Sequence, residues 1–461
     1  SHGGFAGDDR FDMSQLKKIT GGVCAPEGFA AGATGCGIKT GKVLRDDIAI
    51  VWSESPCASA ATFTTNKVKA APVLVSAEHL KAGRNRAVVL NSGNANACTG
   101  AQGLKDARAM AAAAAKLLEL EPKEVLVCST GRIGVSMPMD RVAKGIAALE
   151  PTPSGSKAAA AAIMTSDTFA KEFAVEVKTS KGNFRIGGIA KGAGMIDPNM
   201  ATMLCVVSTD AALPQPVLRK ELRRSVANSF NRITIDGDMS TNDTVILLAN
   251  GLSGTTPALA DFSEALDEVT RALARMIVSD GEGVSRFVEV EVLGAANDKE
   301  ARTAAEAIAN STLVKCAWAG GDPNWGRILD AVGYCGVRMN EAKTDIFYDK
   351  LAAVKNGIAT KTSPEKLRAI TKKKAFKVSV DLHIGKGSYY VWTTDLTEEY
   401  VRAVDEYGLT YSQLKQISRN TLTYSFLQPD AKTRELQRLE QAFAEYESRL
   451  AAIFQAVPLG L

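Results

Sequence analysis

Short apolar runs alternate with alanine-rich helical stretches along most of this chain, and the alternation restricts its fold more than any other feature. Residues 87–90 and 125–128 are apolar runs of strand length, and residues 102–120 between them have a strongly helical composition. Each of these two strands runs into a loop of glycine and small polar residues. Strands that alternate with helices in this way are typical of α/β proteins, and we expect that class here.

The middle of the chain departs from the alternation around one irregular segment. Residues 173–177 and 184–189 have strand composition, and the turn-forming residues 180–183 between them predict a hairpin. Residues 191–202 then show neither a helical nor a strand period, and an apolar strand starts at Met203. We therefore predict a loop containing Gly, Pro and Asn that leads directly into a buried strand.

The second half of the chain ends in a region of different character. Helices are expected at 216–230 and 262–277 and a strand at 245–248. From about residue 409 the sequence is charged, helical in composition and free of glycine-rich loops. Its apolar residues at alternating three- and four-residue spacing form a stripe that predicts one helix face packed on its own domain or on a partner helix. They are Leu436, Leu439, Phe443, Tyr446 and Leu450.

The composition excludes several classes of protein. With 461 residues, 46% hydrophobic and 23% charged, the chain is an ordinary globular protein of two to three domains. Its net charge of +4 is spread without a basic stripe, and no apolar run reaches the about 18 residues of a membrane span, so we expect neither a nucleic-acid partner nor a membrane. Residues 1–12 lack a starting Met and an apolar signal core, and we expect them outside the fold, disordered or left over from processing.

The histidine and cysteine counts bear on cofactors and compartment. Only three histidines occur, which argues against a histidine-rich metal centre. The eight cysteines include no Cys-x-x-Cys pair, and we expect buried free thiols in a reducing compartment. The expected location is the cytoplasm, or an organelle matrix if the chain is eukaryotic.

Thr202 stands where a threonine can become a nucleophile. If the bond between Ala201 and Thr202 breaks, the freed α-amine, with an ordinary pKa of about 7.7–8.0, can take the proton of the same residue's hydroxyl without a histidine. The cut would proceed by attack of the Thr202 hydroxyl on the Ala201 carbonyl, and water would hydrolyse the resulting ester. From residue types alone, an ordinary loop-to-strand junction is the favoured interpretation.

Five motifs, in order along the chain, resemble those of the ornithine acetyltransferase (glutamate N-acetyltransferase) family. Lys191-Gly-Ala-Gly-Met-Ile-Asp-Pro-Asn-Met-Ala-Thr202-Met-Leu204 is similar to the family's autoprocessing motif. Ser129-Thr-Gly-Arg-Ile-Gly134 is similar to its oxyanion loop. The other three are Asn91-Ser-Gly-Asn-Ala-Asn-Ala-Cys-Thr-Gly100, Asp236-Gly-Asp-Met-Ser-Thr-Asn-Asp243 and Gly321-Asp-Pro-Asn-Trp-Gly-Arg327.

The resemblance covers about residues 18–400 and implies an architecture. The fold would be α/β, with layered sheets flanked by helices as in ornithine acetyltransferases, and with an added helical C-terminal tail. The chain would divide into an α fragment, residues 1–201, a β fragment that starts at the nucleophile, residues 202–404, and a tail, residues 405–461.

Position by position, the resemblance assigns roles to single residues. It makes Ala201 and Thr202 the cleavage site, and Thr202 the catalytic nucleophile and acyl carrier. Thr130 and Gly131 stand where the family places its oxyanion-hole donors, which stabilise charge on a tetrahedral oxygen. Substrate-binding positions are matched by Thr168, Lys191, Thr202 and Glu282.

The side chains at these substrate-binding positions suit an amino-acid substrate, because a lysine suits a carboxylate and a glutamate suits an amine. Without the resemblance, Thr130 and Gly131 would form a simple turn. Thr168, Lys191 and Glu282 would then be a helix-end threonine, a surface lysine and a turn glutamate.

The turn that begins at Asp236 has two interpretations. Asp236 and Asp238 could ligate a metal ion, but no cluster of further ligands accompanies them, and we favour a turn with Asx hydrogen bonds and no metal.

The implied reaction is a ping-pong transfer in arginine biosynthesis. Thr202 takes acetyl from N-acetylornithine, ornithine leaves, and glutamate collects the acetyl group. No cofactor is expected, although some family members accept acetyl-CoA as a second donor. The resemblance also implies an α2β2 heterotetramer of the chain's own fragments.

Two departures from the family pattern keep other functions open. Val404 and Leu409 stand where the family has an Asn and a Thr or Ser that reach the substrate, and the last sixty or so residues resemble the C-terminal helices of adenosine deaminases. The zinc ligands of a deaminase are absent, so we reject that activity. Two alternatives remain: an N-terminal-nucleophile amidohydrolase or aminopeptidase that uses Thr202, or an inactive paralogue with an interaction tail.

Overall fold

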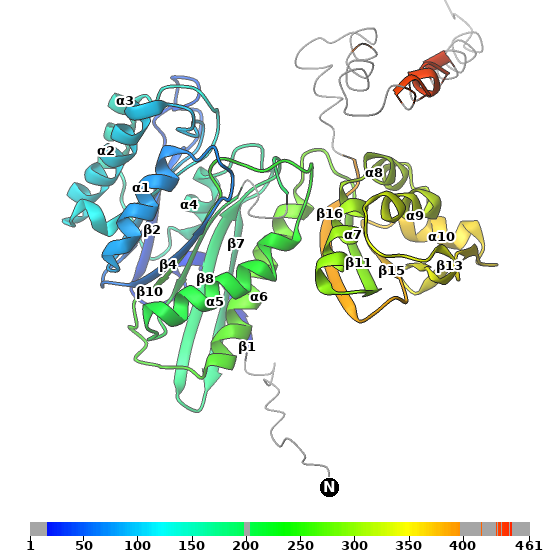
Figure 1. Ribbon diagram of the computed structural model, residues 1–461. Coiled ribbons are helices and arrows are strands. Elements are labelled where there is room, and N and C mark those ends of the chain that lie inside the picture. Colours follow the sequence, from blue (N-terminus) through cyan, green and yellow to red (C-terminus); the bar gives the residue numbers. More distant parts are fainter. Residues whose placement is uncertain are drawn as a thin grey trace, which may run out of the picture. The chain divides into compact units, whose positions relative to one another are not determined.

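The computed structural model describes residues 16–197 and 203–396, together with residues 416, 430, 432–434, 436–441 and 443–444. The chain divides into two units, Ser1–Thr397 and Glu398–Leu461. The main helices and strands of the first unit are labelled in Figure 1. Ala201 and Thr202 lie outside the described residues, as do Val404 and Leu409.

The largest sheet of the N-terminal half has six strands in the order β1-β7-β8-β9-β10-β4. The residues of β9 and β10 are buried throughout, as expected for central strands covered on both faces. These two strands pair in parallel, and the helix α5 (Gln215–Ala227) lies between them in the chain, as a parallel connection requires. The strands are β1 (Leu16–Ile19), β4 (Ala58–Phe63), β7 (Lys171–Thr179), β8 (Gly182–Lys191), β9 (Leu204–Thr209) and β10 (Thr244–Ala249).

A second sheet has four strands in the order β2-β3-β5-β6. They are β2 (Phe29–Thr34), β3 (Ile48–Ser53), β5 (Ala87–Asn91) and β6 (Val125–Ser129). The strands β5 and β6 are parallel, and the 19-residue helix α2 connects them. The helices of this part are α1 (Ala71–His79), α2 (Gly100–Leu118), α3 (Met139–Ala147) and α4 (Ser156–Ala162).

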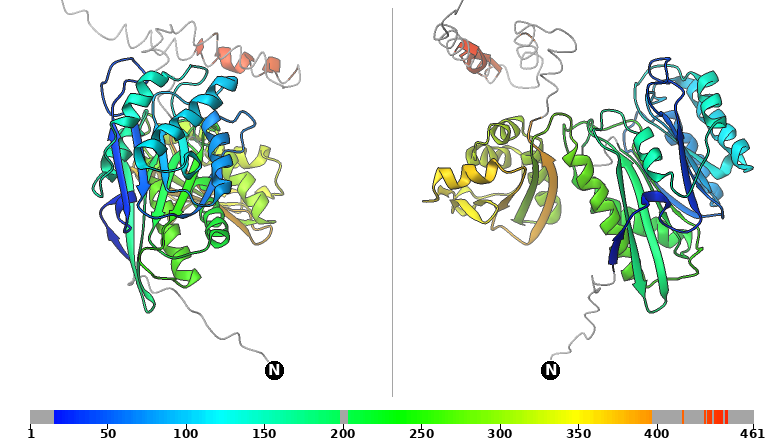
Figure 2. Two further views of the ribbon diagram at one scale, coloured as in Figure 1. Left: turned by 90° about the vertical axis from the view of Figure 1, so that its left-hand side faces the viewer. Right: turned by 180° about the vertical axis from the view of Figure 1, so that it is seen from behind.

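The two sheets stack face to face. Alternate residues of a strand point to opposite sides of its sheet, so the two faces of β5 enter different cores. Val88 and Leu90 of β5 enter a core shared with Val206 of β9, whereas Val89 faces a separate core with Met110 of α2. On the far side of the six-stranded sheet, Val207 packs in a core with the helices α5 (Gln215–Ala227) and α6 (Leu259–Ser279). The result is four layers of helix, sheet, sheet and helix (Figure 2), which confirms the predicted layered sheets flanked by helices.

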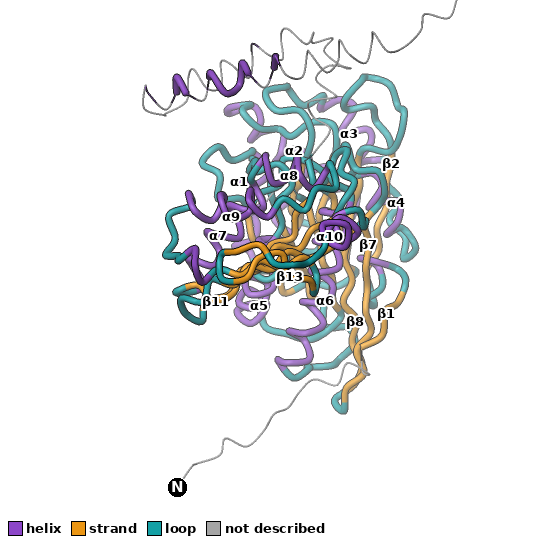
Figure 3. Tube along the Cα trace, turned by 90° about the vertical axis from the view of Figure 1, so that its right-hand side faces the viewer, coloured by secondary structure: helices purple, strands orange, loops and turns teal. Residues whose placement is uncertain are grey.

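A third sheet, formed by residues 287–394, has the order β14-β13-β12-β15-β11-β16 (Figure 3). In β11, Val288, Val290 and Val292 face a core with the helices, while Glu289 and Glu291 on the other face pair with Lys377. The strands are β11 (Phe287–Ala295), β12 (Asp345–Tyr348), β13 (Leu351–Lys355), β14 (Ile358–Ala359), β15 (Ala375–Asp381) and β16 (Gly387–Thr394). The helices are α7 (Asp298–Asn310), α8 (Thr312–Ala319), α9 (Trp325–Tyr334) and α10 (Pro364–Thr371).

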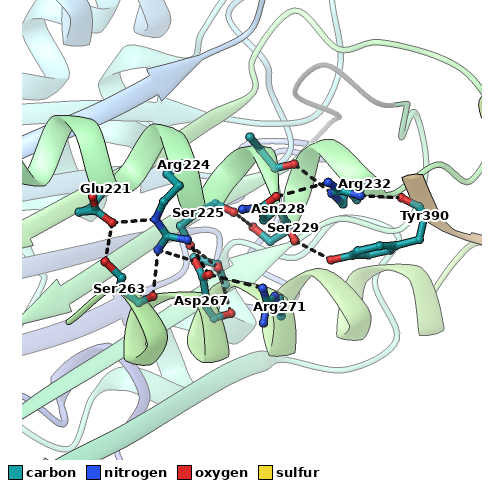
Figure 4. A network of polar contacts seen from close by, with 12 residues as sticks. Glu221, Arg224, Ser225, Asn228, Ser229, Arg232, Ser263, Asp267, Arg271 and Tyr390 are labelled. Atoms are coloured by element: carbon teal, nitrogen blue, oxygen red, sulfur yellow. Dashed lines mark hydrogen bonds and ion pairs between the residues drawn. The ribbon is translucent and has the colours of Figure 1, made fainter. Parts of the chain in front are cut away.

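A polar network joins α5, α6 and β16 (Figure 4). The guanidinium of Arg224 on α5 lies between Glu221 of the same helix and Asp267 of α6, with contacts of 2.7 Å to each carboxylate. The Tyr390 hydroxyl of β16 donates to the Asn228 carbonyl just after α5, at 3.1 Å. The third sheet is therefore fixed to α5 by side-chain contacts, which keeps β16 next to the helical layer.

The expected elements agree with the structure except at their ends. The helix expected at 216–230 ends at Ala227, and residues 230–232 form a separate 3-10 turn. In the tail, all described residues are helical, and Leu436, Leu439 and Phe443 of the apolar stripe are half-buried. Tyr446 and Leu450 lie outside the described residues. None of the helices described here has the length and apolarity to cross a membrane.

All eight cysteines are free thiols, but the expectation that all are buried was wrong. Cys98 is exposed, and Cys316 and Cys335 are half-buried. The exposed thiol follows from the local backbone, since Cys98 lies in an irregular loop with a positive φ of 56° instead of in a strand or helix.

Candidate active site

The loop from Asp236 to Asp243 contacts the chain on both sides of the segment 198–202. The carboxylate of Asp236 accepts hydrogen bonds from the backbone N–H groups of Met195 and Ile196. The carboxylate of Asp243 accepts from the N–H of Met203, at 3.0 Å. Both chain ends that flank the predicted cleavage site are thus held by one loop.

The predicted Asx turn within this loop is present. Asp236 Oδ1 accepts from the N–H of Asp238 at 3.1 Å, which is the hydrogen bond of such a turn. Burial raises the pKa of Asp236, and its backbone donors oppose that rise. In residues 16–197 and 203–396, no group of three or more His, Cys, Asp or Glu side chains is arranged to hold a metal ion.

Thr130 and Gly131 follow β6 directly and lie in the loop expected to hold oxyanion donors. The backbone N–H of Thr130 donates to the Asn91 carbonyl at 3.0 Å, so it is not free for a ligand. Within the described part of the chain, no hydrogen bond engages the Thr130 hydroxyl or the Gly131 N–H. Gly131 has φ +131°, and its backbone lies against that of Gly93. The two groups left available are a hydroxyl and the N–H of the next residue.

A buried cluster of charge surrounds the positions expected to bind substrate. Lys171, fully buried at the start of β7, contacts Asp167 at 2.7 Å and Asp280 at 2.5 Å. Thr168 donates its backbone N–H and its hydroxyl to Asp280. Burial would raise the pKa of Asp167, but the ammonium groups of Lys191 and Lys171 outweigh it and hold that pKa at about 2.

Lys191 is the last residue of β8, and it is buried rather than on the surface. In the β-sheet register it lies opposite Leu204, two residues after Thr202. Its Nζ is 3.9 Å from Asp167 Oδ2, and burial lowers its pKa, while the carboxylates of Asp167, Asp243 and Glu282 oppose that shift. The backbone N–H of Glu282 donates to the Ala193 carbonyl at 3.0 Å, so the loop after α6 meets the loop after β8.

The structure thus brings Thr168, Lys191 and Glu282 into one region. It also reveals four polar residues to which the sequence analysis had assigned no individual role. Asp167, Lys171 and Asp280 form the buried ionic cluster, and Asn242 donates from its side chain to the Ser129 carbonyl at 2.8 Å and to the Ala95 carbonyl at 2.6 Å. The sequence signal for the cluster is weak: a lysine at a strand end and an aspartate at a helix end are common at protein surfaces.

The carboxyl of Asp243 is fully buried, and burial raises its pKa well above the ordinary value. Its Oδ1 accepts from Met203, while Oδ2 has no hydrogen-bond partner among the described residues. The hydroxyl of Thr64 lies nearby but donates to the Ser240 carbonyl at 2.8 Å. A buried carboxyl oxygen without a hydrogen-bond partner is unusual in native proteins and costs free energy.

Comparison with known proteins places these motifs in a family. The model of the ArgJ family matches residues 30–408. The arginine biosynthesis bifunctional protein ArgJ of Geobacter sulfurreducens is 47% identical over 393 residues, covering 83% of this chain and 99% of the relative. The mitochondrial protein of the same name from Heterostelium pallidum is 44% identical over 83% of this chain and 94% of its own. The crystal structure of a Mycobacterium tuberculosis ornithine acetyltransferase complexed with ornithine is 42% identical over 41% of this chain and 100% of that chain, with a TM-score of 0.37.

Proposed function

This chain belongs to the ArgJ family of arginine-biosynthesis acetyltransferases, and on that premise we propose that it cuts itself before Thr202 and carries acetyl on that threonine from N-acetylornithine to glutamate. The observation that carries the proposal is the register of β8 and β9. It sets the predicted substrate lysine, Lys191, opposite Leu204, which follows the predicted nucleophile by two positions in the sequence. Asp243 holds Met203, the residue after the nucleophile, at the same end.

Self-cleavage and acyl transfer use the same hydroxyl. In the cut, Thr202 Oγ1 attacks the Ala201 carbonyl, the peptide C–N bond breaks as the amine leaves, and water hydrolyses the ester to free the Ala201 carboxylate. In transfer, the freed α-amine accepts the hydroxyl proton and Oγ1 attacks the acetyl carbonyl. The proton passes to the leaving ornithine amine, and the amine of glutamate then takes the acetyl group from the threonine ester.

Hydrogen bonds already formed within the fold limit which groups of Thr130 and Gly131 can act as oxyanion donors. Since the Thr130 N–H is bonded to Asn91, we infer that Thr130 contributes its hydroxyl and Gly131 its backbone N–H. Preorganised donors of this kind are each worth about 2.7–4 kcal/mol of transition-state stabilisation in other enzymes.

The charged side chains suit an amino-acid substrate. A substrate carboxylate would give buried Lys191 a close counter-charge, which Asp167 at 3.9 Å supplies only in part. Thr168 donates its hydroxyl proton to Asp280, so its oxygen can only accept from a substrate, as an ammonium requires. Glu282 offers a second partner for an amine. The site therefore fits a substrate that carries a carboxylate and a free amino group, and N-acetylornithine and glutamate both carry these two groups.

Family membership also supports expectations that the geometry does not address. We infer an α2β2 assembly of the two fragments in the cytoplasm, or in an organelle matrix in a eukaryote, and transfer without a bound cofactor. Acetyl-CoA is a candidate second donor.

The test is an assay of purified protein with N-acetylornithine and glutamate, in which ornithine and N-acetylglutamate are measured together with free acetate. We expect ornithine and N-acetylglutamate in equal amounts and no turnover by Thr202→Ala. Acetate released at the same rate without glutamate would instead identify a hydrolase. A chain that ends at Val401 should show whether the residues beyond it, Val404 and Leu409 included, alter the KM for N-acetylornithine.

A further inference from the structure

A cavity of about 620 Å³ lies where the end of α6 meets the starts of β11 and β15. Three of the side chains that line it are cationic, those of Arg275, Arg286 and Lys374, and none of the described residues that line it is an aspartate or a glutamate. The volume of the cavity is in the range of small-molecule sites. The charge of its walls indicates an anionic ligand.

Two of these cations have no counter-charge in the fold. Arg271, one turn earlier on α6, contacts Asp267 at 3.4 Å (Figure 4). In the described part of the chain, no ion pair or hydrogen bond includes the side chain of Arg275 or Lys374. The guanidinium of Arg275 instead lies over the rings of Phe287 and Trp392, 5.3 and 5.5 Å from their centroids. Such stacking orients the guanidinium without neutralising it, and the N–H groups at its edge can still donate.

Arg286 contributes a fixed donor and little net charge. Its Nη1 contacts the buried carboxylate of Asp395 at 2.9 Å, and its Nε donates to the Thr371 carbonyl at 2.7 Å. Its Nη2 makes no hydrogen bond within residues 16–197 and 203–396, and the same holds for the hydroxyl of Ser279, which also lines the cavity. Both groups are therefore available to a ligand.

The charge of the cavity stays positive when the backbone is counted. Arg275 and Lys374 each bring one positive charge, whereas Arg286 and Asp395 cancel each other. The C-terminal end of α6 lies at Ser279, and a helix end of this kind carries about half a negative charge. More than one positive charge remains, which an anion with two or more charges balances better than a monovalent ion.

We propose that this cavity is a binding site for a small multivalent anion, of the phosphate-ester or polycarboxylate class, which Arg275, Lys374 and the Nη2 of Arg286 hold. The site is separate from the proposed acetyl-transfer site, because none of the residues assigned to catalysis or substrate binding lines it. The two sites are close in the chain, since Ser279 and Ser285 line the cavity and flank the turn that carries Asp280.

The experiment is isothermal titration calorimetry of the purified protein with inorganic pyrophosphate and, separately, with citrate. Sodium chloride at equal ionic strength is the blank. The site variant is Arg275→Gln combined with Lys374→Gln. The control variant is Arg219→Gln combined with Lys220→Gln, which removes the same charge from exposed side chains of α5 that do not line the cavity. Thermal unfolding and acetyl transfer without added anion show that each variant is folded.

We expect one anion to bind per protomer, with a Kd that is about tenfold higher in the site variant and unchanged in the control. Each exposed charge contributes up to about fivefold to such an interaction. The Kd should also rise with added sodium chloride, because salt screens exposed charges. Tighter binding of pyrophosphate than of citrate would assign the site to phosphate esters, and the reverse would assign it to polycarboxylates.

A single substitution keeps the test decisive if the double variant does not fold. Lys374→Gln removes no hydrogen bond or ion pair of the described residues, and it should still raise the Kd by about two- to fivefold. Heat no greater than the blank from both anions, or an equal Kd in the site and control variants, would overturn the proposal.

Discussion

Thr168 and Asp280 are 112 positions apart in the chain, yet Asp280 accepts both the backbone N–H and the hydroxyl of Thr168. The same carboxylate contacts the ammonium of Lys171 at 2.5 Å. A residue predicted to bind substrate is thus fixed in position by an ion pair buried beneath it. The arrangement separates two roles, because the hydroxyl of Thr168 can be removed while the ion pair stays.

Thr168→Val should raise the KM for N-acetylornithine at least about tenfold, the cost of about 1.4 kcal/mol of lost polar contact. Its melting temperature should fall only slightly, because Asp280 keeps Lys171 as a partner. Asp280→Asn should change both quantities, since it removes a charge from a buried pair. Equal losses of stability in the two variants would contradict this separation of roles.

Gly131→Ala should abolish transfer and destabilise the fold. A Cβ at this position would lie 2.4 Å from the carbonyl carbon of Gly93, so the backbone that carries the proposed oxyanion donor must move. Gly134→Ala is the matched control in the same loop, because Gly134 also has a positive φ, of +76°, but nothing lies within 4 Å of its added Cβ. Both variants carry roughly 1–2 kcal/mol of backbone strain.

Gly131→Ala differs from Gly134→Ala by this clash and by its larger φ, +131° against +76°. The comparison is made from their melting temperatures and their kcat values. Similar activity in Gly131→Ala and Gly134→Ala would show that the backbone at Gly131 is not part of the site.

The fold could be predicted largely from local pattern, and the site only in part. The strand at 87–90 and the helix at 102–120 could be predicted because the pattern of apolar residues in each segment is evident in the sequence. The core that Val88 and Val206 share could not be predicted, since it depends on which faces of the two sheets pack together. The ionic cluster of Asp167, Lys171 and Asp280 was missed for a similar reason, because Asp280 meets the segment 167–171 only in the folded chain.

The burial and hydrogen-bond partners of a predicted site residue were harder to infer than its position in the sequence. Lys191 has the sequence context of a surface lysine, with glycine directly after it, yet it is 2% exposed. The backbone N–H of Thr130 could not be known to be engaged, because Asn91 reaches it only through the pairing of β5 and β6. Motifs therefore located the chemistry, whereas the donors that are free to act depend on sheet register.

Lys315 should make stability rise with pH. Burial lowers its pKa to about 7 from the ordinary 10.5, although Asp236 and Asp395 oppose the shift. Between those two values the unfolded chain binds a proton that the folded chain does not. The free energy of unfolding should then increase with pH from about 7 to about 10.5, by up to about 1.4 kcal/mol per pH unit.

Denaturant unfolding of wild type and Lys315→Met across this pH range tests the assignment. The variant also loses hydrogen bonds from Nζ to Thr393 and Thr394 at the end of β16, so it should be less stable where the lysine is neutral. The difference between the two proteins should change with pH in the stated direction. A constant difference would mean that Lys315 keeps its proton in the fold.

The most direct test of the central claim is the intact mass of the purified protein under denaturing conditions. Self-cleavage predicts two fragments, one ending at Ala201 and one starting at Thr202, and Thr202→Ala should give one uncut chain of 461 residues without transferase activity. A wild-type protein that transfers acetyl as a single uncut chain, or a Thr202→Ala variant that is still cut at this bond, would contradict the account.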